Sequence, residues 1–182
     1  MNETYSQPDF YHFSEDSILL AKHVASILKG QSFETLVDIG AGSGIIAIEI
    51  ARLLNIKKIT FIEVQQEFYE HIKYNCDTYL NNVEFEIIKS CSDAKFADIV
   101  VANPPYFLEG DGRPGKDLKR HRCRFIAADG FGKFIFELKK FKKDNGHSFF
   151  ISKKNKIIEE LLKIKKIELA VSLEKRSIYK VY

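Results

Sequence analysis

The amino-acid sequence predicts an α/β fold with a mostly parallel seven-stranded sheet, helices on both faces and an antiparallel C-terminal hairpin. Two segments carry this prediction. The apolar strand expected at 35–39 runs into the glycine-rich segment 40–44, and a helical pattern follows directly. A second apolar run at 99–101 stops at Asn-Pro-Pro-Tyr (103–106), where consecutive prolines cannot continue a sheet ladder.

The length and composition are those of one globular domain. The chain has 182 residues, of which 45% are hydrophobic and 29% charged. We therefore expect a single domain over 1–182. It comprises an N-terminal arm and helix (1–30), a ligand-binding half (35–106) and a basic loop followed by the C-terminal half (107–182).

The polar N-terminus and the cysteine content exclude several classes of protein. No basic-then-apolar leader and no apolar run of membrane-spanning length is present. Cys76, Cys91 and Cys123 form no Cys-x-x-Cys pair, which argues against a disulfide framework or a zinc site. These features predict a cytoplasmic protein without a metal.

Hydrophobic periodicity predicts the remaining elements. Helices are expected at 15–29, 45–54, 66–80, 131–141 and 155–165, and strands at 35–39, 58–62, 83–88, 99–101, 147–151, 167–173 and 177–182. Ser14 is the expected N-cap of the first helix, and Gly30 its stop. Asn145-Gly146 is expected to turn into the strand at 147–151. The segment 107–124 is Gly-rich and then basic, so we expect a flexible loop there.

Polar residues follow the first strands at the sheet edge where open α/β folds bind ligands. The glycines let backbone N–H groups approach a ligand at a helix N-terminus. Asp38 could accept from a ligand's ammonium group or orient the loop, Glu63 could bind ribose hydroxyls, and Asp93 could accept from an adenine amino group. The residues expected to bind a cofactor are Asp38, Gly40, Ala41, Gly42, Gly44, Glu63, Val64, Ser92, Asp93 and Asn103.

The Asn-Pro-Pro-Tyr segment predicts a rigid polar corner, although Asn and Pro are also ordinary turn residues. The side-chain carbonyl of Asn103 and the main-chain carbonyl of Pro104 suit an amino group, which has two hydrogens to donate. Accepting both would stabilise positive charge that develops on the nitrogen. Tyr106 offers a face for a planar base or amide. The expected catalytic residues are Asn103, Pro104, Pro105 and Tyr106.

Charge is distributed unevenly along the chain. Residues 1–106 carry 8 Lys and Arg against 15 Asp and Glu, whereas residues 107–182 carry 20 against 10. A basic second half suits a polyanion, unless the lysines only cover solvated helix faces. The basic loop beside the corner suits a phosphate backbone. The residues expected to contact the substrate are Tyr106, Phe107, Arg113, Lys116, Lys119, Arg120, Arg122 and Arg124.

With these features in place, the whole chain resembles a class I S-adenosylmethionine-dependent methyltransferase, which has a Rossmann-like fold. The corner resembles the signature of enzymes that methylate an exocyclic or amide nitrogen. The opening Gln7-Pro8 with Phe13-Ser14-Glu15-Asp16-Ser17-Ile18-Leu19-Leu20-Ala21, and Asn-Pro-Pro-Tyr-Phe-x-x-Gly at 103–110, look like the bacterial tRNA1(Val) adenine-37 N6-methyltransferase family. The basic stretch at 119–125 departs from that family's pattern.

The resemblance implies transfer of a methyl group from S-adenosyl-L-methionine to N6 of adenine in RNA, with tRNA as the expected partner and a monomer favoured. A release-factor glutamine methyltransferase shares the corner but carries an additional N-terminal helical domain. A DNA adenine methyltransferase would need a target-recognition region, for which the chain has no room. A non-catalytic RNA-binding protein remains an alternative, while the glycine spacing disfavours an NAD-dependent oxidoreductase.

Overall fold

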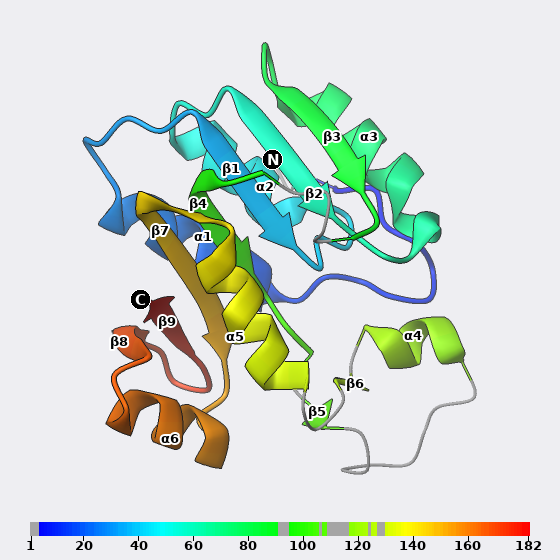
Figure 1. Ribbon diagram of the computed structural model, residues 1–182. Helices are drawn as coiled ribbons and strands as arrows, with labels where there is room; N and C mark the ends of the chain where they lie inside the picture. Colours follow the sequence, from blue (N-terminus) through cyan, green and yellow to red (C-terminus); the bar gives the residue numbers. More distant parts are fainter. Residues whose placement is uncertain (1–3, 91–94, 106, 109–116, 124, 127–129) are drawn as a thin grey trace.

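A seven-stranded sheet forms the centre of the computed structural model, which describes residues 4–90, 95–105, 107–108, 117–123, 125–126 and 130–182 (Figure 1). The strand order is β3-β2-β1-β4-β7-β9-β8. The strands are β1 (Thr35–Ile39), β2 (Lys58–Ile62), β3 (Glu84–Ile88), β4 (Ala97–Ala102), β7 (Lys142–Ser152), β8 (Ile167–Ser172) and β9 (Ser177–Val181). β9 pairs antiparallel with both β7 and β8, and the other adjacent strands of this sheet pair parallel. The predicted mostly parallel sheet with an antiparallel C-terminal hairpin is confirmed.

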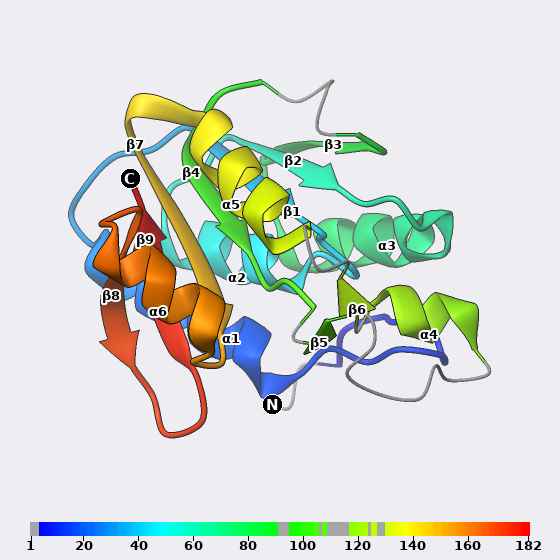
Figure 2. The ribbon, with the colours of Figure 1, turned by 60° about the horizontal axis from the view of Figure 1, so that its bottom comes forward.

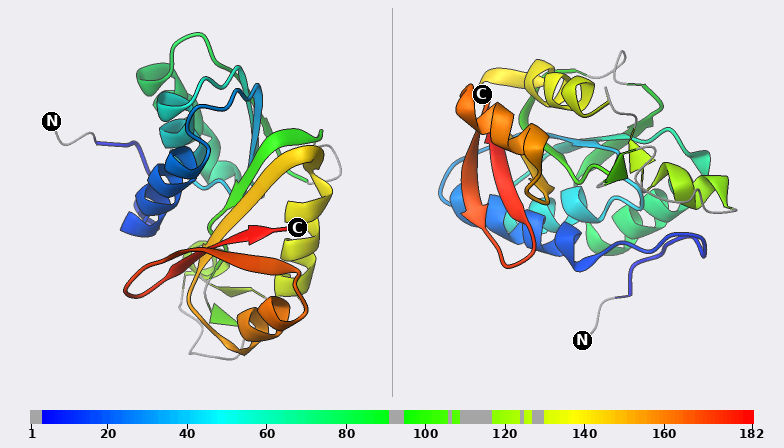
Figure 3. Two further views of the ribbon diagram at one scale, coloured as in Figure 1. Left: turned by 90° about the vertical axis from the view of Figure 1, so that its left-hand side faces the viewer. Right: turned by 90° about the horizontal axis from the view of Figure 1, so that it is seen from below.

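Helices cover both faces of this sheet (Figure 3). One face carries α1 (Glu15–Ile27), α2 (Ile45–Leu53) and α3 (Tyr69–Tyr79), which follows the 3-10 turn η1 (Gln66–Phe68). The other face carries α5 (Gly130–Lys140) and α6 (Lys156–Lys163). None of the helices in the described ranges is long and apolar enough to cross a membrane.

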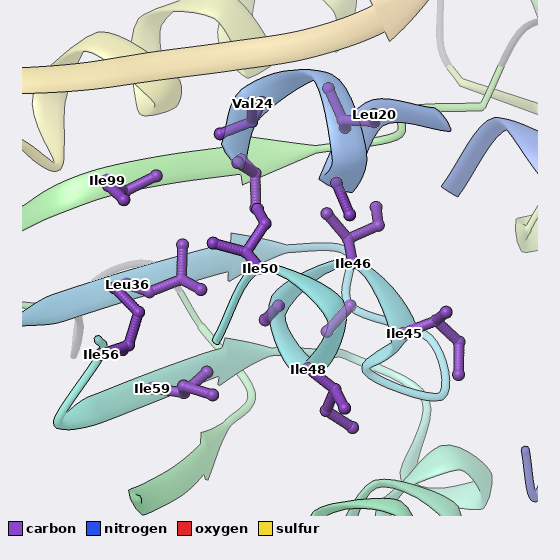
Figure 4. Packing of buried hydrophobic residues seen from close by; sticks show 14 of the residues in the cluster. Leu20, Val24, Leu36, Ile45, Ile46, Ile48, Ile50, Ile56, Ile59 and Ile99 are labelled. Carbon is purple, nitrogen blue, oxygen red and sulfur yellow. The ribbon is translucent and has the colours of Figure 1, made fainter. Parts of the chain in front are cut away.

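The strand β4 is buried on both faces over 99–102, as its apolar run predicts. Ile99 and Val101 belong to the apolar cluster under α1, α2 and α3, part of which Figure 4 shows. Val100 and Ala102 belong to the cluster under α5 and α6. Because the last four side chains of β4 are buried, the end of the strand is held rigidly, and so is the corner that follows it.

Strand register brings the predicted site together at the carboxyl edge of the sheet. Ile39 at the end of β1 pairs with Ile62 in β2 and with Ala102 in β4. Gly40, Glu63 and Asn103 are the next residues of these three strands, so they leave the sheet side by side. The chain reverses its winding between β1 and β4, which is where open α/β sheets form a ligand-binding crevice.

Two expectations from the sequence are wrong. The segment 107–124 is not loop throughout, because it contains the short strand β5 (Phe107–Leu108), which pairs with β6 (Phe125–Ile126), and the helix α4 (Leu118–Arg122). Asp117 caps α4 by accepting from the amides of Lys119 and Arg120. The strand β7 already includes 142–146, so the expected turn at Asn145-Gly146 lies inside a strand whose pairing with β4 is irregular.

Gly146 is required by close backbone packing in that irregular pairing. A Cβ atom there would lie 2.9 Å from the carbonyl oxygens of both Ala97 and Asp98. We expect Gly146→Ala to lower the free energy of unfolding by about 1–3 kcal/mol, because backbone atoms must move. Gly132→Ala, in helix α5 where nothing lies within 4 Å, should instead raise it by about 0.5–1 kcal/mol. Urea unfolding of both variants checks this, and equal midpoints would contradict it.

Candidate functional site

The glycine loop between β1 and α2 folds around three left-handed residues. Gly40, Gly42 and Gly44 have φ of +70°, +54° and +81°, a region that other residues adopt only with strain. The amides of Gly40 and Ala41 donate to the carbonyl of Ile62, at 2.8 and 3.1 Å. The loop is thereby fixed to the end of β2, and it delivers the chain into the N-terminus of α2.

Glu63 joins the glycine loop to the segment after β2. Its carboxylate accepts from the amides of Gly42 and Gln65, both at 2.8 Å, and its side chain is buried. Burial raises the pKa of Glu63, while the amides of Gln65 and Gly42 oppose that rise. Each carboxylate oxygen has a second lone pair, so Glu63 can still accept from a ligand hydroxyl.

Asp38 is completely buried and carries an unsatisfied carboxylate. Neither of its oxygens has a well-formed hydrogen bond. Burial raises the pKa of Asp38 to about 7; the Ala47 amide opposes the rise and the charge of Glu63 adds to it. The residues that line the three cavities described below do not include Asp38. Orienting the loop and accepting from a ligand's ammonium group both stay predictions for this carboxylate.

Three adjoining cavities open at this edge of the sheet, and all three are lined by Tyr11 and Asn103. The donor cavity, as we name the first, has a volume of about 180 Å³ and is lined by Ile39, Gly40, Gly42, Glu63, Val64, Gln65, Phe68, Pro104, Pro105, Cys123 and Phe134. A smaller cavity of about 50 Å³ lies against the glycine loop and Ser17. The acceptor cavity, as we name the third, has a volume of about 300 Å³ and shares Asn103, Pro104 and Pro105 with the donor cavity.

The corner after β4 stands where these cavities meet. Asn103 is partly buried, and its amide nitrogen donates to the hydroxyl of Ser17 in α1 at 3.4 Å. This contact engages the nitrogen of the amide and so orients the carbonyl away from Ser17. Pro104 is buried and Pro105 partly buried, so the corner is packed as well as stiff. Tyr106 lies outside the described residues.

The N-terminal arm is folded across the same edge (Figure 2). The amide of Ser6 donates to Asn75 at 2.8 Å, and Asn75 in turn donates to the carbonyl of Ser43 in the glycine loop. Phe10 packs edge-on against Phe68 with 5.4 Å between ring centroids. In the aromatic arm, Phe10 therefore packs against the domain, while Tyr11 forms part of the cavity walls.

Most described residues that the sequence singled out do meet here. Gly40, Gly42, Glu63, Val64, Asn103, Pro104 and Pro105 line the donor cavity, and Ala41 lines the small one. Gly44 is the N-cap of α2, where its absent side chain avoids Phe61. Ser92, Asp93, Arg113, Lys116 and Arg124 lie outside the described residues.

Two of the predicted basic contacts, Lys119 and Arg120, do not line the three cavities. Lys119 in α4 pairs with Glu67 at 2.9 Å and lies 5.9 Å from the ring of Phe10. Arg120 is exposed beside it. Phe107 lies in β5 and Arg122 in α4, as backbone positions. Among the described residues, no group of three His, Cys, Asp or Glu side chains is arranged to hold a metal ion.

Sequence reasoning missed several residues that line the cavities, among them Gln65, Cys123, Lys153 and Arg176. Gln65 donates to the sulfur of Cys123 at 3.2 Å, which brings α4 against the donor cavity. Lys153 and Arg176 line the acceptor cavity. The position of Lys153 directly after a strand could have been noticed. Arg176 precedes a strand, and only the antiparallel direction of β9 places it at this edge.

The comparisons with known proteins agree with this architecture. The family model described as "Methyltransferase small domain" matches residues 12–117. A tRNA1(Val) (adenine(37)-N6)-methyltransferase of Christiangramia forsetii is 26% identical over 122 residues, which cover 63% of this chain and 50% of that protein. A Methanocaldococcus jannaschii protein, named for protein N5-glutamine methylation, is 29% identical over 150 residues, which cover 76% of this chain and 70% of that protein.

Solved structures show the same fold. A T. thermophilus 16S rRNA N2 G1207 methyltransferase, in complex with AdoMet and guanosine, superposes with a TM-score of 0.69 and 17% identity, over 93% of this chain and 43% of that one. The chain spans about half the length of the tRNA-modifying relative described above. The matching model covers more than half of this sequence, including the glycine loop and the corner. The chain therefore belongs to the methyltransferase small domain family.

Proposed function

We propose that this chain is an S-adenosylmethionine-dependent N-methyltransferase that methylates N6 of adenine in RNA, with tRNA as the expected substrate class. One observation carries the proposal. Asn103 and Pro104, two fixed carbonyl acceptors, line both the cavity at the glycine loop and the cavity beyond it. An amino group held at this corner would face a methyl donor in the donor cavity, while the rest of the substrate would lie in the acceptor cavity. The relatives named for tRNA adenine methylation support this substrate.

The residues of the donor cavity fit S-adenosylmethionine. Gly40 and Gly42 leave room for a ligand against the loop, Glu63 has lone pairs for ribose hydroxyls, and apolar residues such as Phe68 and Phe134 complete the wall. The unsatisfied carboxylate of Asp38 is buried close by, where a cationic ligand would favour its ionised form. When bound, the cofactor supplies a sulfonium methyl group, an electrophile that needs no metal or covalent enzyme intermediate.

The corner would act by positioning and by electrostatics. The carbonyl oxygens of Asn103 and Pro104 accept the two hydrogens of the amino group and direct its lone pair toward the donor cavity. As the nitrogen becomes positively charged, both hydrogen bonds become stronger, so they stabilise the transition state more than the bound substrate. The extra proton leaves to water after the new N–C bond has formed, so no general base is needed at the corner.

Methylation of a glutamine amide is the second candidate. Its NH2 group presents the same two hydrogens to the same two acceptors. The Methanocaldococcus jannaschii relative and a release factor glutamine methyltransferase of Koribacter versatilis, 28% identical over 102 residues, favour it. The corner alone does not distinguish the two substrates, because both reactions occur on a planar nitrogen.

Product analysis separates these candidates. The protein is incubated with labelled S-adenosylmethionine and either unmodified bulk tRNA or a release factor, and the digested product is identified. N6-methyladenosine is the expected product. Methylglutamine as the product would show that the substrate is a protein and would leave the N-methyl transfer unchanged. Failure to bind S-adenosylmethionine in a thermal-shift assay would overturn the proposal altogether.

Glu63→Gln should weaken cofactor binding without unfolding the protein. A glutamine side chain has a single oxygen, so it cannot accept from the amides of Gly42 and Gln65 while also accepting from ribose. We expect the Kd for S-adenosylmethionine to rise about 10- to 100-fold, a loss typical of hydrogen bonds to a charged group. Calorimetric titration measures this. Glu86→Gln, on the neighbouring strand at Thr60, is the matched control and should leave the Kd unchanged.

A further inference from the structure

The acceptor cavity has a polar, cationic wall on the side away from the corner. Lys153 and Arg176 form this wall together with His12, Ser14 and Asp16, and the cavity continues to Asn103, Pro104 and Pro105. Its volume of about 300 Å³ is at the lower end of the range for small-molecule sites, about 300–1,000 Å³. The cavity can therefore take a group larger than the reacting amine alone.

The topology of the C-terminal hairpin brings these two cations to the corner. Ala102 in β4 pairs with Phe150 in β7, and Ser152 at the end of β7 pairs with Ser177 at the start of β9. Lys153 follows Ser152 and Arg176 precedes Ser177, so both leave the sheet at the edge that carries Asn103. Figure 1 shows the β8–β9 connection at the same edge as the end of β7.

The charges in this wall favour a singly charged anion. Arg176 pairs with Asp16 at 3.1 Å, and both side chains are largely buried. The pair ties the hairpin to the first turn of α1 and fixes the guanidinium in the cavity wall. With His12 counted as neutral, the formal charges of the lining residues Lys153, Arg176 and Asp16 sum to +1, which suits one phosphodiester. A glutamine side chain in a protein brings no such charge.

We infer that Lys153 and Arg176 bind the backbone phosphate next to the methylated nucleotide, and that this contact selects nucleic acid over protein at the acceptor cavity. The inference rests on the proposed N-methyltransferase function and specifies its substrate. It differs from the contacts predicted on the basic loop, because these cations belong to the C-terminal half of the sheet and line the same cavity as the corner. A base that stands on the corner would have its own phosphate within the same cavity.

The test uses full-length protein with bound S-adenosylhomocysteine and a short fluorescent oligoadenylate RNA as the probe. Anisotropy titrations at several salt concentrations compare wild type with Lys153→Ala. We expect the variant to bind about tenfold more weakly, and the slope of log K against log salt to fall by about one, as for one lost phosphate contact. Lys153→Arg keeps the charge and should restore both values.

Lys154→Ala is the matched control, because Lys154 is adjacent in sequence but pairs with Glu159 outside the cavity. It should leave both affinity and salt slope unchanged. An equal loss of RNA affinity in Lys153→Ala and Lys154→Ala would overturn the inference. So would wild-type protein that does not bind the RNA, or RNA that a glutamine-containing peptide displaces from it. Thermal shift with S-adenosylmethionine is measured on the same samples, so failure of the cofactor function is seen separately from failure of the phosphate site.

Discussion

Asn103→Ala should reduce methyl transfer about 1,000-fold or more while leaving the Kd for S-adenosylmethionine within about twofold of wild type. The variant removes an acceptor whose hydrogen bond strengthens as charge develops on the nitrogen, so the loss should be in kcat. Under the proposed function, the glycine loop and Glu63 hold most of the cofactor, and the variant keeps their mutual contact. Single-turnover kinetics with the methylated product identified by mass spectrometry, together with calorimetry for the cofactor, measure the two effects.

Two further variants make this prediction specific. Asn103→Asp keeps an oxygen acceptor at the corner, so we expect it to retain measurable turnover where alanine does not. Asn81→Ala, in an exposed turn far along the chain from the corner, is the control for a generic Asn-to-Ala change. If Asn103→Ala kept wild-type kcat, the two-acceptor corner would have no part in the reaction. If it lost cofactor binding to the same extent as turnover, the role of Asn103 would be structural.

Asp38→Asn should make the protein more stable at alkaline pH. Burial raises the pKa of Asp38 in the folded protein to about 7, from an ordinary value of 3.8. The unfolded chain therefore releases this proton first as pH rises, and stability falls between about pH 4 and 7. The group costs about 4 kcal/mol of unfolding free energy at pH 8 relative to pH 4, and the asparagine variant lacks that dependence.

Urea unfolding of wild type and Asp38→Asn at pH 4, 6 and 8 measures the difference, since other titrating groups are common to both proteins. Asp98→Asn provides a control of opposite sign. Burial would raise the pKa of Asp98, but Lys143, the Glu34 amide and Thr35 lower it to about 2. That carboxylate stabilises the fold above about pH 4 and the effect is lost as pH falls, so its removal should destabilise the protein at neutral pH. If wild type and Asp38→Asn differed in unfolding free energy by the same amount at every pH, burial would not raise the pKa of Asp38.

The local sequence determines each element whose formation depends on its own residues. The glycine loop needs positive φ at Gly40, Gly42 and Gly44, and no other residue type adopts this without strain. The apolar run in β4 and the two prolines after it likewise predict a buried strand and a stiff corner. These features, with Glu63 at the next strand end, predict a ligand site at the edge of the sheet where the donor cavity lies.

Tertiary structure decided which charges meet the corner. Arg176 lies more than 70 residues after Asn103 and precedes a strand, so only the pairing of β9 with β7 shows that it belongs to the same edge. The charge of Lys119 suggested a contact with a phosphate backbone. In the structure this side chain pairs with Glu67. Whether Asp38 touches a ligand also depended on packing, since burial and hydrogen-bond satisfaction are set by neighbours far apart in the chain. A sequence carries residue chemistry and local backbone preference, whereas the partners of each charge follow from long-range strand register.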